Sequence, residues 1–152
     1  MRIGIGNDHT AVDLKLIIKK HLEDKGFEVT DFGTASRESS NYPIYGARVA
    51  KAVATGKMDL GIVICGTGIG IGLAANRVPG IRCAICSDPY SARMAREHNN
   101  CNMLAFGARV VGSEVAKMLV DEWLDHTYET RHQVRLDMLD KLANGEEIEK
   151  RG

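Results

Sequence analysis

Residues 60–76, LGIVICGTGIGIGLAAN, decide the fold of this chain. Residues 60–64 form a short apolar run with β-branched side chains, which predicts a strand buried on both faces, as in a parallel sheet. Cys65 ends the run, four glycines then alternate with Thr67 and two isoleucines, and residues 73–75 are compatible with a helix. The stretch therefore predicts a strand, a glycine-rich turn and the start of a helix.

The glycines indicate a ligand with negative charge. Gly66, Gly68, Gly70 and Gly72 lack a Cβ, so the backbone can approach a ligand closely and point N–H groups at it, beside the positive end of the next helix. The same dipoles favour the thiolate form of Cys65, which makes this thiol a candidate base or nucleophile. The alternative interpretation of Cys65 is a small buried residue that merely ends a strand.

Composition narrows the class of protein. A chain of 152 residues can bury a sizeable core, and we expect one domain over residues 1–152, with a last helix from about residue 131 and a charged tail at 144–152. Twenty basic and twenty acidic side chains leave no net charge, which argues against nucleic acid and membrane surfaces as partners. The sequence shows neither a signal peptide nor an apolar span, so we expect a cytoplasmic protein.

Strands and helices are predicted to alternate along the chain. Strands are expected at residues 2–6, 27–32, 60–64, 81–86 and 103–106. Helices are expected from a cap at Thr10 to Gly26, from Pro43 to Gly56, after the glycine loop, from a cap at Asp88, from a cap at Ser113 and from about Arg131. This alternation predicts an α/β fold: a single Rossmann-like three-layer domain whose five-stranded parallel sheet carries helices on both faces.

The commonest strand order for such a sheet is 2-1-3-4-5, and we adopt it as the expectation. Its switch point lies between the first and third strands, where ligands bind beyond the carboxyl ends. Under this order Asp8 and His9 face the same crevice as Cys65 and Thr67.

The other cysteines and the histidines predict no metal site. Cys83 and Cys86 are three apart in an expected strand and so point to opposite faces, which suits neither chelation nor a disulfide. Cys101 lies in a polar stretch, and all four thiols are expected to be reduced. His98 is either a site residue or a cation favoured at a helix C-terminus.

Two known nucleotide motifs are excluded, and one arginine pair is compatible with a phosphate site. Ile71 occupies the third glycine position of Gly-x-Gly-x-x-Gly, and the sequence has no Gly-Lys-Ser/Thr. Arg131 and Arg135 are four residues apart on one expected helix face, a spacing that suits a phosphate. A solvated charged face would have the same spacing.

Several motifs together resemble those of a known family. They are Asn7-Asp8-His9, Asn41-Tyr42-Pro43, Cys65-Gly66-Thr67-Gly68-Ile69-Gly70, Arg96-Glu97-His98-Asn99, Gly107-Ala108-Arg109-Val110 and Arg131-His132. In this order they resemble the type B ribose-5-phosphate isomerases and the related galactose-6-phosphate isomerase subunits. The resemblance implies interconversion of ribose 5-phosphate and ribulose 5-phosphate through an enediolate, without metal or organic cofactor.

The resemblance also implies roles for particular residues. Cys65 would move the carbon-bound proton, Thr67 would assist transfer between the sugar oxygens, and His98 would open the furanose ring near Asp8. The implied catalytic set is Cys65, Thr67, His98 and Asp8, and the implied substrate-binding set is His9, Tyr42, Gly66, Gly68, Ile69, Gly70, Asn99, Arg109, Arg131 and Arg135. The family forms dimers or tetramers in which one subunit's His98, Asn99 and arginines reach the partner's crevice.

Three departures from the family pattern bear on the substrate. Thr10-Ala11 replaces a small residue and a glycine, Gly72 replaces a frequent serine, and Glu129-Thr130 shortens a Glu-Gly-Gly segment. A six-carbon substrate, allose 6-phosphate or galactose 6-phosphate, is therefore an alternative. Two further alternatives are a cysteine hydrolase or transferase with His98 as its base, and a non-catalytic sugar-phosphate sensor.

Overall fold

The computed structural model describes residues 1–149, and the end of the predicted tail, residues 150–152, lies outside them. The strands are β1 Arg2–Asn7, β2 Glu28–Asp31, β3 Leu60–Cys65, β4 Cys83–Ile85 and β5 Met103–Gly107. The helices are α1 Val12–Asp24, α2 Tyr42–Ala54, α3 Ile69–Asn76, α4 Pro89–Glu97, α5 Ser113–Leu124 and α6 Gln133–Ala143, with 3₁₀ turns η1 His9–Ala11 and η2 Thr130–His132. The predicted α/β fold with a five-stranded parallel sheet is confirmed.

The predicted order of the last two strands is wrong. The observed order is β2-β1-β3-β5-β4, so β5 lies between β3 and β4. Every residue of β5 is buried, whereas β4 has three residues and exposes Ile85. A short, partly exposed strand suits a sheet edge, and a fully buried one suits the interior. The switch point between β1 and β3 is as predicted.

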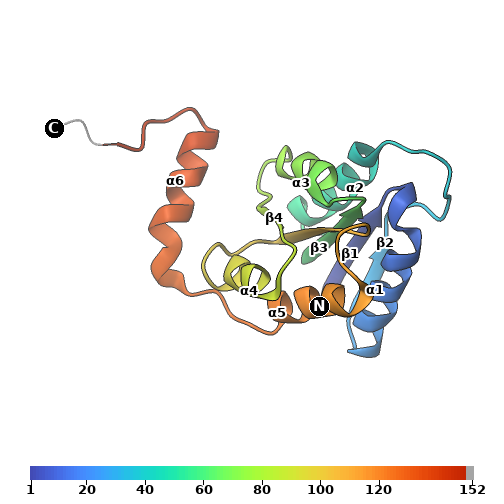
Figure 1. Ribbon diagram of the computed structural model, residues 1–152. Helices are drawn as coiled ribbons and strands as arrows, with labels where there is room; N and C mark the ends of the chain where they lie inside the picture. Colours follow the sequence, from blue (N-terminus) through green and yellow to red (C-terminus); the bar gives the residue numbers. More distant parts are fainter. Residues whose placement is uncertain (150–152) are drawn as a thin grey trace.

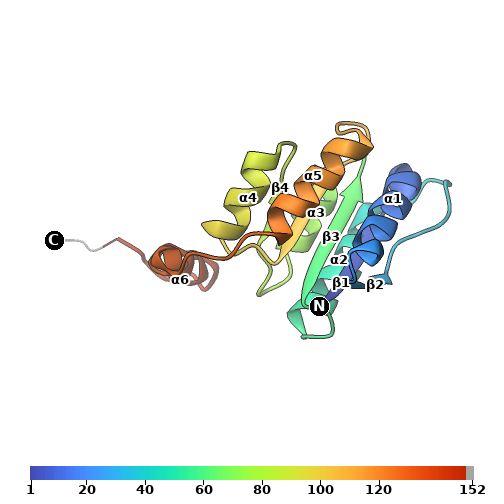
Figure 2. The same cartoon turned by 90° about the horizontal axis from the view of Figure 1, so that it is seen from below.

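This strand order determines which face each helix covers. The chain steps outward from β3 to β4 and then back to β5, so right-handed crossovers place α3 and α4 on opposite faces. Helices α2 and α3 cover one face, and α1, α4 and α5 cover the other (Figures 1 and 2). Each face has its own apolar core, one containing Phe106 and Trp123 and the other containing Val49, Val63 and Ile71.

Two of the expected helix caps are different in the structure. The N-cap of α1 is Ala11, not Thr10, and Asp8 caps the preceding 3₁₀ turn η1, with its Oδ1 accepting from the Thr10 N–H at 3.0 Å. Gly112 is the N-cap of α5, and Ser113 is its first residue. The Asp88 cap is confirmed, with Oδ1 accepting from the Ser91 N–H at 2.8 Å.

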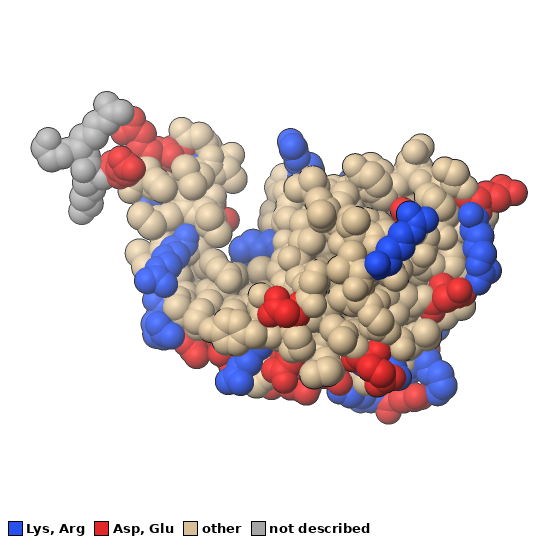
Figure 3. Space-filling model, viewed as in Figure 1, with Lys and Arg blue, Asp and Glu red and all other residues tan. Residues whose placement is uncertain are grey.

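Helix α6 projects from the rest of the molecule as an arm (Figure 1). Leu136 is buried at its base, while Val134, Leu139 and Leu142 are about half exposed or more. Figure 3 shows a hollow between this arm and the body, and a cleft of about 410 Å³ runs between α6 and the segment around Arg82. Among residues 1–149, no helix has the length and apolarity needed to cross a bilayer.

Candidate active site

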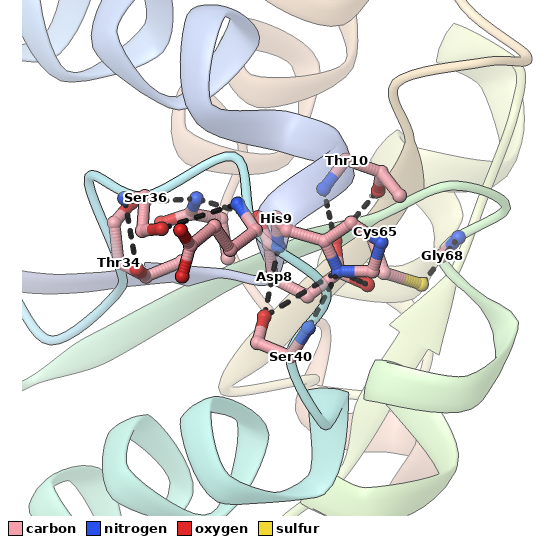
Figure 4. Close-up of polar contacts among 10 residues, drawn as sticks. Asp8, His9, Thr10, Thr34, Ser36, Ser40, Cys65 and Gly68 are labelled. Carbon is pink, nitrogen blue, oxygen red and sulfur yellow. Dashed lines mark hydrogen bonds and ion pairs between the residues drawn. The ribbon is translucent and has the colours of Figure 1, made fainter.

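The residues predicted to face one crevice lie where β1 and β3 end side by side. The Asp8 N–H donates to the Ile64 carbonyl at 3.3 Å, which places Asp8 and His9 next to Cys65 at the carboxyl edge of the sheet (Figure 4). The segment after β5 joins them, because the Arg109 N–H donates to the Gly66 carbonyl at 3.0 Å. The predicted meeting of Asp8, His9 and Cys65 is therefore confirmed.

Gly68 and Gly70 are required for a reason that differs in part from the predicted approach of a ligand. Gly68 has φ +81°, and a methyl group built on it would lie 2.6 Å from the Phe106 backbone carbon. A methyl group on Gly70 would lie 2.7 Å from the Tyr42 ring. At these two positions the missing side chain leaves room for other residues of the protein. The contact at Gly70 places Tyr42 against the loop.

Gly66 is the loop glycine at which an added methyl group would be tolerated. A methyl group there would lie 3.6 Å from Arg109 Cδ and 3.7 Å from Thr10 Oγ1, both ordinary contacts. The backbone at Gly66 thus lies beside an exposed arginine and a hydroxyl.

The loop directs backbone donors at the thiol and at the start of α3. Cys65 is 5% exposed, and its Sγ accepts from the Gly68 N–H at 3.2 Å. The Ile69 N–H donates to Thr67 Oγ1 at 3.2 Å, and the first intrahelical bond runs from Gly72 to Gly68. The N–H groups of Gly70 and Ile71 therefore have no acceptor within the helix and are suited to an oxyanion.

The other three thiols lie in different surroundings. Burial raises the pKa of Cys86 to about 12 and that of Cys101 to about 11, and it raises the pKa of Cys83 further. Cys83 and Cys86 belong to the cores on opposite faces of the sheet, as predicted. All four cysteines are free.

Asp8 has a partner that the sequence analysis missed. The Thr10 hydroxyl donates to Asp8 Oδ1 at 2.6 Å, in addition to the Thr10 N–H. The departure at position 10 thus adds a donor to a carboxylate that is itself 5% exposed. An Asp side chain often accepts a hydrogen bond from the backbone N–H two residues later in the chain. This local turn is the sequence signal for the arrangement.

The remaining predicted residues lie at the other end of the sheet, where the strands begin. His98 follows α4, and Asn99 lies just before β5, whose far end reaches the Cys65 crevice. Five strand residues separate the two ends by roughly 15 Å. Arg131 and Arg135 follow on η2 and α6, and the Glu129 N–H ties that segment to the Glu97 carbonyl at 2.8 Å. One chain does not bring these four residues to Cys65.

Glu129 is the centre of this second group. Its Oε2 lies 2.8 Å from Arg131 Nη2, 3.6 Å from His132 Nε2 and 4.0 Å from His98 Nε2. Arg131 lowers the pKa of the Glu129 carboxyl by hydrogen bonding and by its charge. The rings of His98 and His132 lie 4.3 Å apart, and desolvation lowers the pKa of buried His132.

Within residues 1–149, the same group is the set of side chains best arranged to hold a metal ion. Ligand atoms of His98, Glu129 and His132 lie within 4.8 Å of one another. However, Arg131 binds the carboxylate, and Arg135 Nη1 lies 3.1 Å from His132 Nδ1. Two guanidinium groups oppose a cation and favour an anion, so the group suits a phosphate better than a metal.

The fold and the loop define a class: a Rossmann-like α/β protein with a thiol beside a glycine-rich loop at the start of a helix. Residues 3–139 match the family model described as Ribose/Galactose Isomerase, and the chain belongs to this family.

Individual relatives agree with this assignment. The chain is 53% identical over 139 residues to "Ribose-5-phosphate isomerase B" of Escherichia coli (strain K12), which covers 91% of this chain and 93% of that protein. It is 45% identical to "D-erythrulose-4-phosphate isomerase" of Pectobacterium atrosepticum, over 85% of this chain and 86% of the other. The solved structure of Clostridium thermocellum Ribose-5-Phosphate Isomerase B superposes with a TM-score of 0.93 and 50% identity, over 95% of this chain and 99% of that one.

Proposed function

We propose that this protein is an aldose–ketose isomerase that interconverts ribose 5-phosphate and ribulose 5-phosphate. The observation that carries the proposal is the Cys65 thiol, which accepts from the Gly68 N–H at the start of α3. A thiolate next to preorganised N–H donors suits a reaction that removes a carbon-bound proton and leaves an enediolate. Membership of the Ribose/Galactose Isomerase family supports the same reaction.

The proposed chemistry is a pair of proton transfers that needs no cofactor. The Cys65 thiolate takes the proton from C2 of the open-chain aldose, and the electron pair moves onto the carbonyl oxygen at C1. Thr67 assists proton transfer between the two oxygens, and the thiol returns its proton to C1 to give the ketose. The N–H group of Gly70, together with that of Ile71, holds the negative oxygen in the intermediate, while the Gly68 N–H donates to the Cys65 thiol.

The phosphate and the sugar ring have separate holders. His9 and Arg109 lie at the crevice and bind the phosphate from one side, and the Gly66 backbone lies beside Arg109. Tyr42 packs on Gly70 and faces the ring hydroxyls together with Asp8.

The rest of the site comes from a second copy of the chain. His98, Asn99, Arg131 and Arg135 are remote from the crevice of their own chain, and α6 carries exposed apolar side chains on a projecting arm. Exposed apolar surface of this kind is characteristic of an interface. A homodimer, or a tetramer of two dimers, would place His98 of one subunit where it can open the ring bound at the partner's Cys65.

The substrate is the least constrained part of the proposal. The crevice does not fix the length of the sugar, and relatives carry names of four- and five-carbon substrates. Allose 6-phosphate and galactose 6-phosphate are the six-carbon alternatives. We also propose a cytoplasmic setting, because a catalytic thiol must remain reduced.

Two functions of other classes compete with isomerisation. A cysteine hydrolase would use Cys65 as nucleophile and His98 as base, which in this chain lie at opposite ends of the sheet. A sensor would bind sugar phosphate without turnover, but binding alone gives no reason for a thiol beside the oxyanion donors.

The decisive experiment is turnover on a panel of four-, five- and six-carbon aldose and ketose phosphates, with and without a chelator. We expect the fastest turnover on ribose 5-phosphate, exchange of the C2 proton with solvent, and unchanged rates after chelation. A covalent adduct on Cys65 during turnover would support the hydrolase, and binding without turnover would support the sensor. Loss of activity on chelation, restored by one divalent metal, would refute the metal-free mechanism.

A further inference from the structure

The segment between β2 and α2 is anchored beneath the crevice by buried polar groups. The Thr34 carbonyl accepts from the Asn7 side-chain amide at 3.0 Å and from Lys15 Nζ at 3.1 Å. Lys15 is 2% exposed and also forms an ion pair with Asp31 at 2.9 Å. Gly33 packs so closely on Asn7 that any side chain there would overlap it. These contacts determine where the rest of the segment runs.

At its C-terminal end, this segment holds His9 by hydrogen bonds with Ser40, an arrangement that we call the Ser40 clamp. The His9 N–H donates to Ser40 Oγ at 3.1 Å, and the Ser40 N–H donates to His9 Nδ1 at 3.1 Å. Ser40 Oγ also lies 3.4 Å from Nδ1. Figure 4 shows the imidazole held between Ser40 and the strand end that carries Cys65.

The clamp determines which ring nitrogen carries the proton. A backbone N–H can only donate, so His9 Nδ1 must accept and cannot itself hold a hydrogen in this geometry. The nearest carboxylate oxygen, Asp8 Oδ2, lies 3.9 Å from Nδ1, beyond hydrogen-bond distance. The neutral ring therefore carries its proton on Nε2.

We propose that Ser40 is a positioning residue for His9: its reciprocal hydrogen bonds hold the imidazole as the Nε2–H tautomer and aim that donor at the substrate phosphate. The link to phosphate rests on the function proposed above, whereas the tautomer does not. Asn41 and Tyr42 follow directly and begin α2, so the same segment sets the positions of a phosphate donor and a ring-facing side chain.

The tautomer can be measured directly. Long-range ¹⁵N–¹H correlation spectra of the full chain at about pH 8, where an ordinary imidazole is neutral, report both ring nitrogens. A His9→Gln variant identifies the His9 signals. We expect a pyrrole-like Nε2 and a pyridine-like Nδ1. A protonated Nδ1 would overturn the proposal.

The positioning role is tested by binding of inorganic phosphate, measured by calorimetry, and by steady-state kinetics. Ser40→Ala removes one neutral hydrogen bond, so we expect the phosphate Kd and the substrate KM to rise by roughly 3- to 10-fold with kcat little changed. Ser40→Thr keeps the hydroxyl and should restore both values. Ser36→Ala is the matched control, because Ser36 caps the Glu38 N–H in the same segment and should leave both values unchanged.

A double-variant cycle separates positioning through His9 from a general loop effect. If Ser40 acts through His9, adding Ser40→Ala to His9→Gln should weaken phosphate binding no further. Additive losses, or an unchanged Kd in folded Ser40→Ala, would refute the role. Because calorimetry and tautomer spectra need no turnover, an inactive chain would count against the proposed isomerase and leave this test intact.

Discussion

The crevice at Cys65 and the group around Glu129 are built in different ways. The crevice rests on the ends of three neighbouring strands, where backbone bonds from Asp8 and Arg109 lock the loops together. The Glu129 group rests on the short connection before α6, and its charges are satisfied mainly by one another. The first holds the thiol proposed as the base but lacks the residue proposed to open the ring, and the second holds that residue, His98, but has no thiol. Each region supplies what the other lacks.

The largest expected effect comes from removing the thiol of the crevice. Cys65→Ala should lower turnover by the ~10²- to 10⁴-fold typical of a lost general base. Cys101→Ala is the matched control, because Cys101 is 7% exposed against 5% for Cys65 and yet burial raises its pKa to about 11. Its turnover should stay close to that of the unmodified chain. A folded Cys65→Ala protein with near-normal turnover would end the proposal that this thiol is the base.

Alkylation distinguishes the same thiols without mutation. Cys65 should react with iodoacetamide before Cys83, Cys86 and Cys101, since burial raises the pKa of those three. Inorganic phosphate should slow the reaction at Cys65, because it fills the same crevice. Mass spectrometry of partly modified protein gives the order, and unprotected or slow labelling of Cys65 would count against the site.

Mixing two inactive variants tests whether the regions meet across subunits. Cys65→Ala and His98→Ala chains, each nearly inactive, should recover about a quarter of the original activity after subunit exchange, because half of the dimers are mixed and each has one intact site. Isotope-labelled chains and native mass spectrometry verify the exchange. Full exchange without recovery would place both residues in one subunit's site.

A smaller effect is expected from the arginines of the Glu129 group. Arg135→Ala removes a charged hydrogen bond, so KM should rise by about 10- to 100-fold. Arg2→Ala is the control, since Arg2 forms an exposed ion pair with Asp59. Steady-state kinetics and the inhibition constant of phosphate provide the measurement. Equal behaviour of the two variants would mean that Arg135 belongs to a solvated face.

The smallest effect concerns the pH dependence of stability. Desolvation and Arg131 lower the pKa of His132 in the folded chain, so the unfolded chain binds the proton first as the pH falls. The stability contribution is present above about pH 6.5, the ordinary value, and is lost as the pH falls toward the lower folded value. His132→Gln should therefore flatten the decrease in Tm between pH 7 and 5. A parallel decrease in both proteins would contradict this assignment.

The local sequence predicted most of the residues at the crevice, but it predicted little of the contacts around them. The β3 run and the glycine loop predict a strand, a turn and a helix start, because propensity and chain geometry there are local. The order of β4 and β5 was not predictable in this way, since both are short apolar runs and right-handed crossovers allow either order. The contacts of Gly68 with Phe106 and of Gly70 with Tyr42 depend on residues distant in sequence. The hydrogen bonds between Ser40 and His9 were not predictable, because the sequence shows only that Ser40 lies in a polar linker.

The close approach of Gly72 and Ile85 limits which substitutions the chain can accept at these two positions. A methyl group on Gly72 would lie 2.5 Å from Ile85 Cγ1, so a larger residue at position 72 requires the Ile85 side chain to shift or to be smaller. The two substitutions are therefore epistatic: Gly72→Ser alone should lower Tm, and adding Ile85→Ala should recover part of the loss. Because Gly72 lies on α3, directly after the Cys65 loop, the side chain at position 85 on the edge strand β4 influences which residues position 72 can accept.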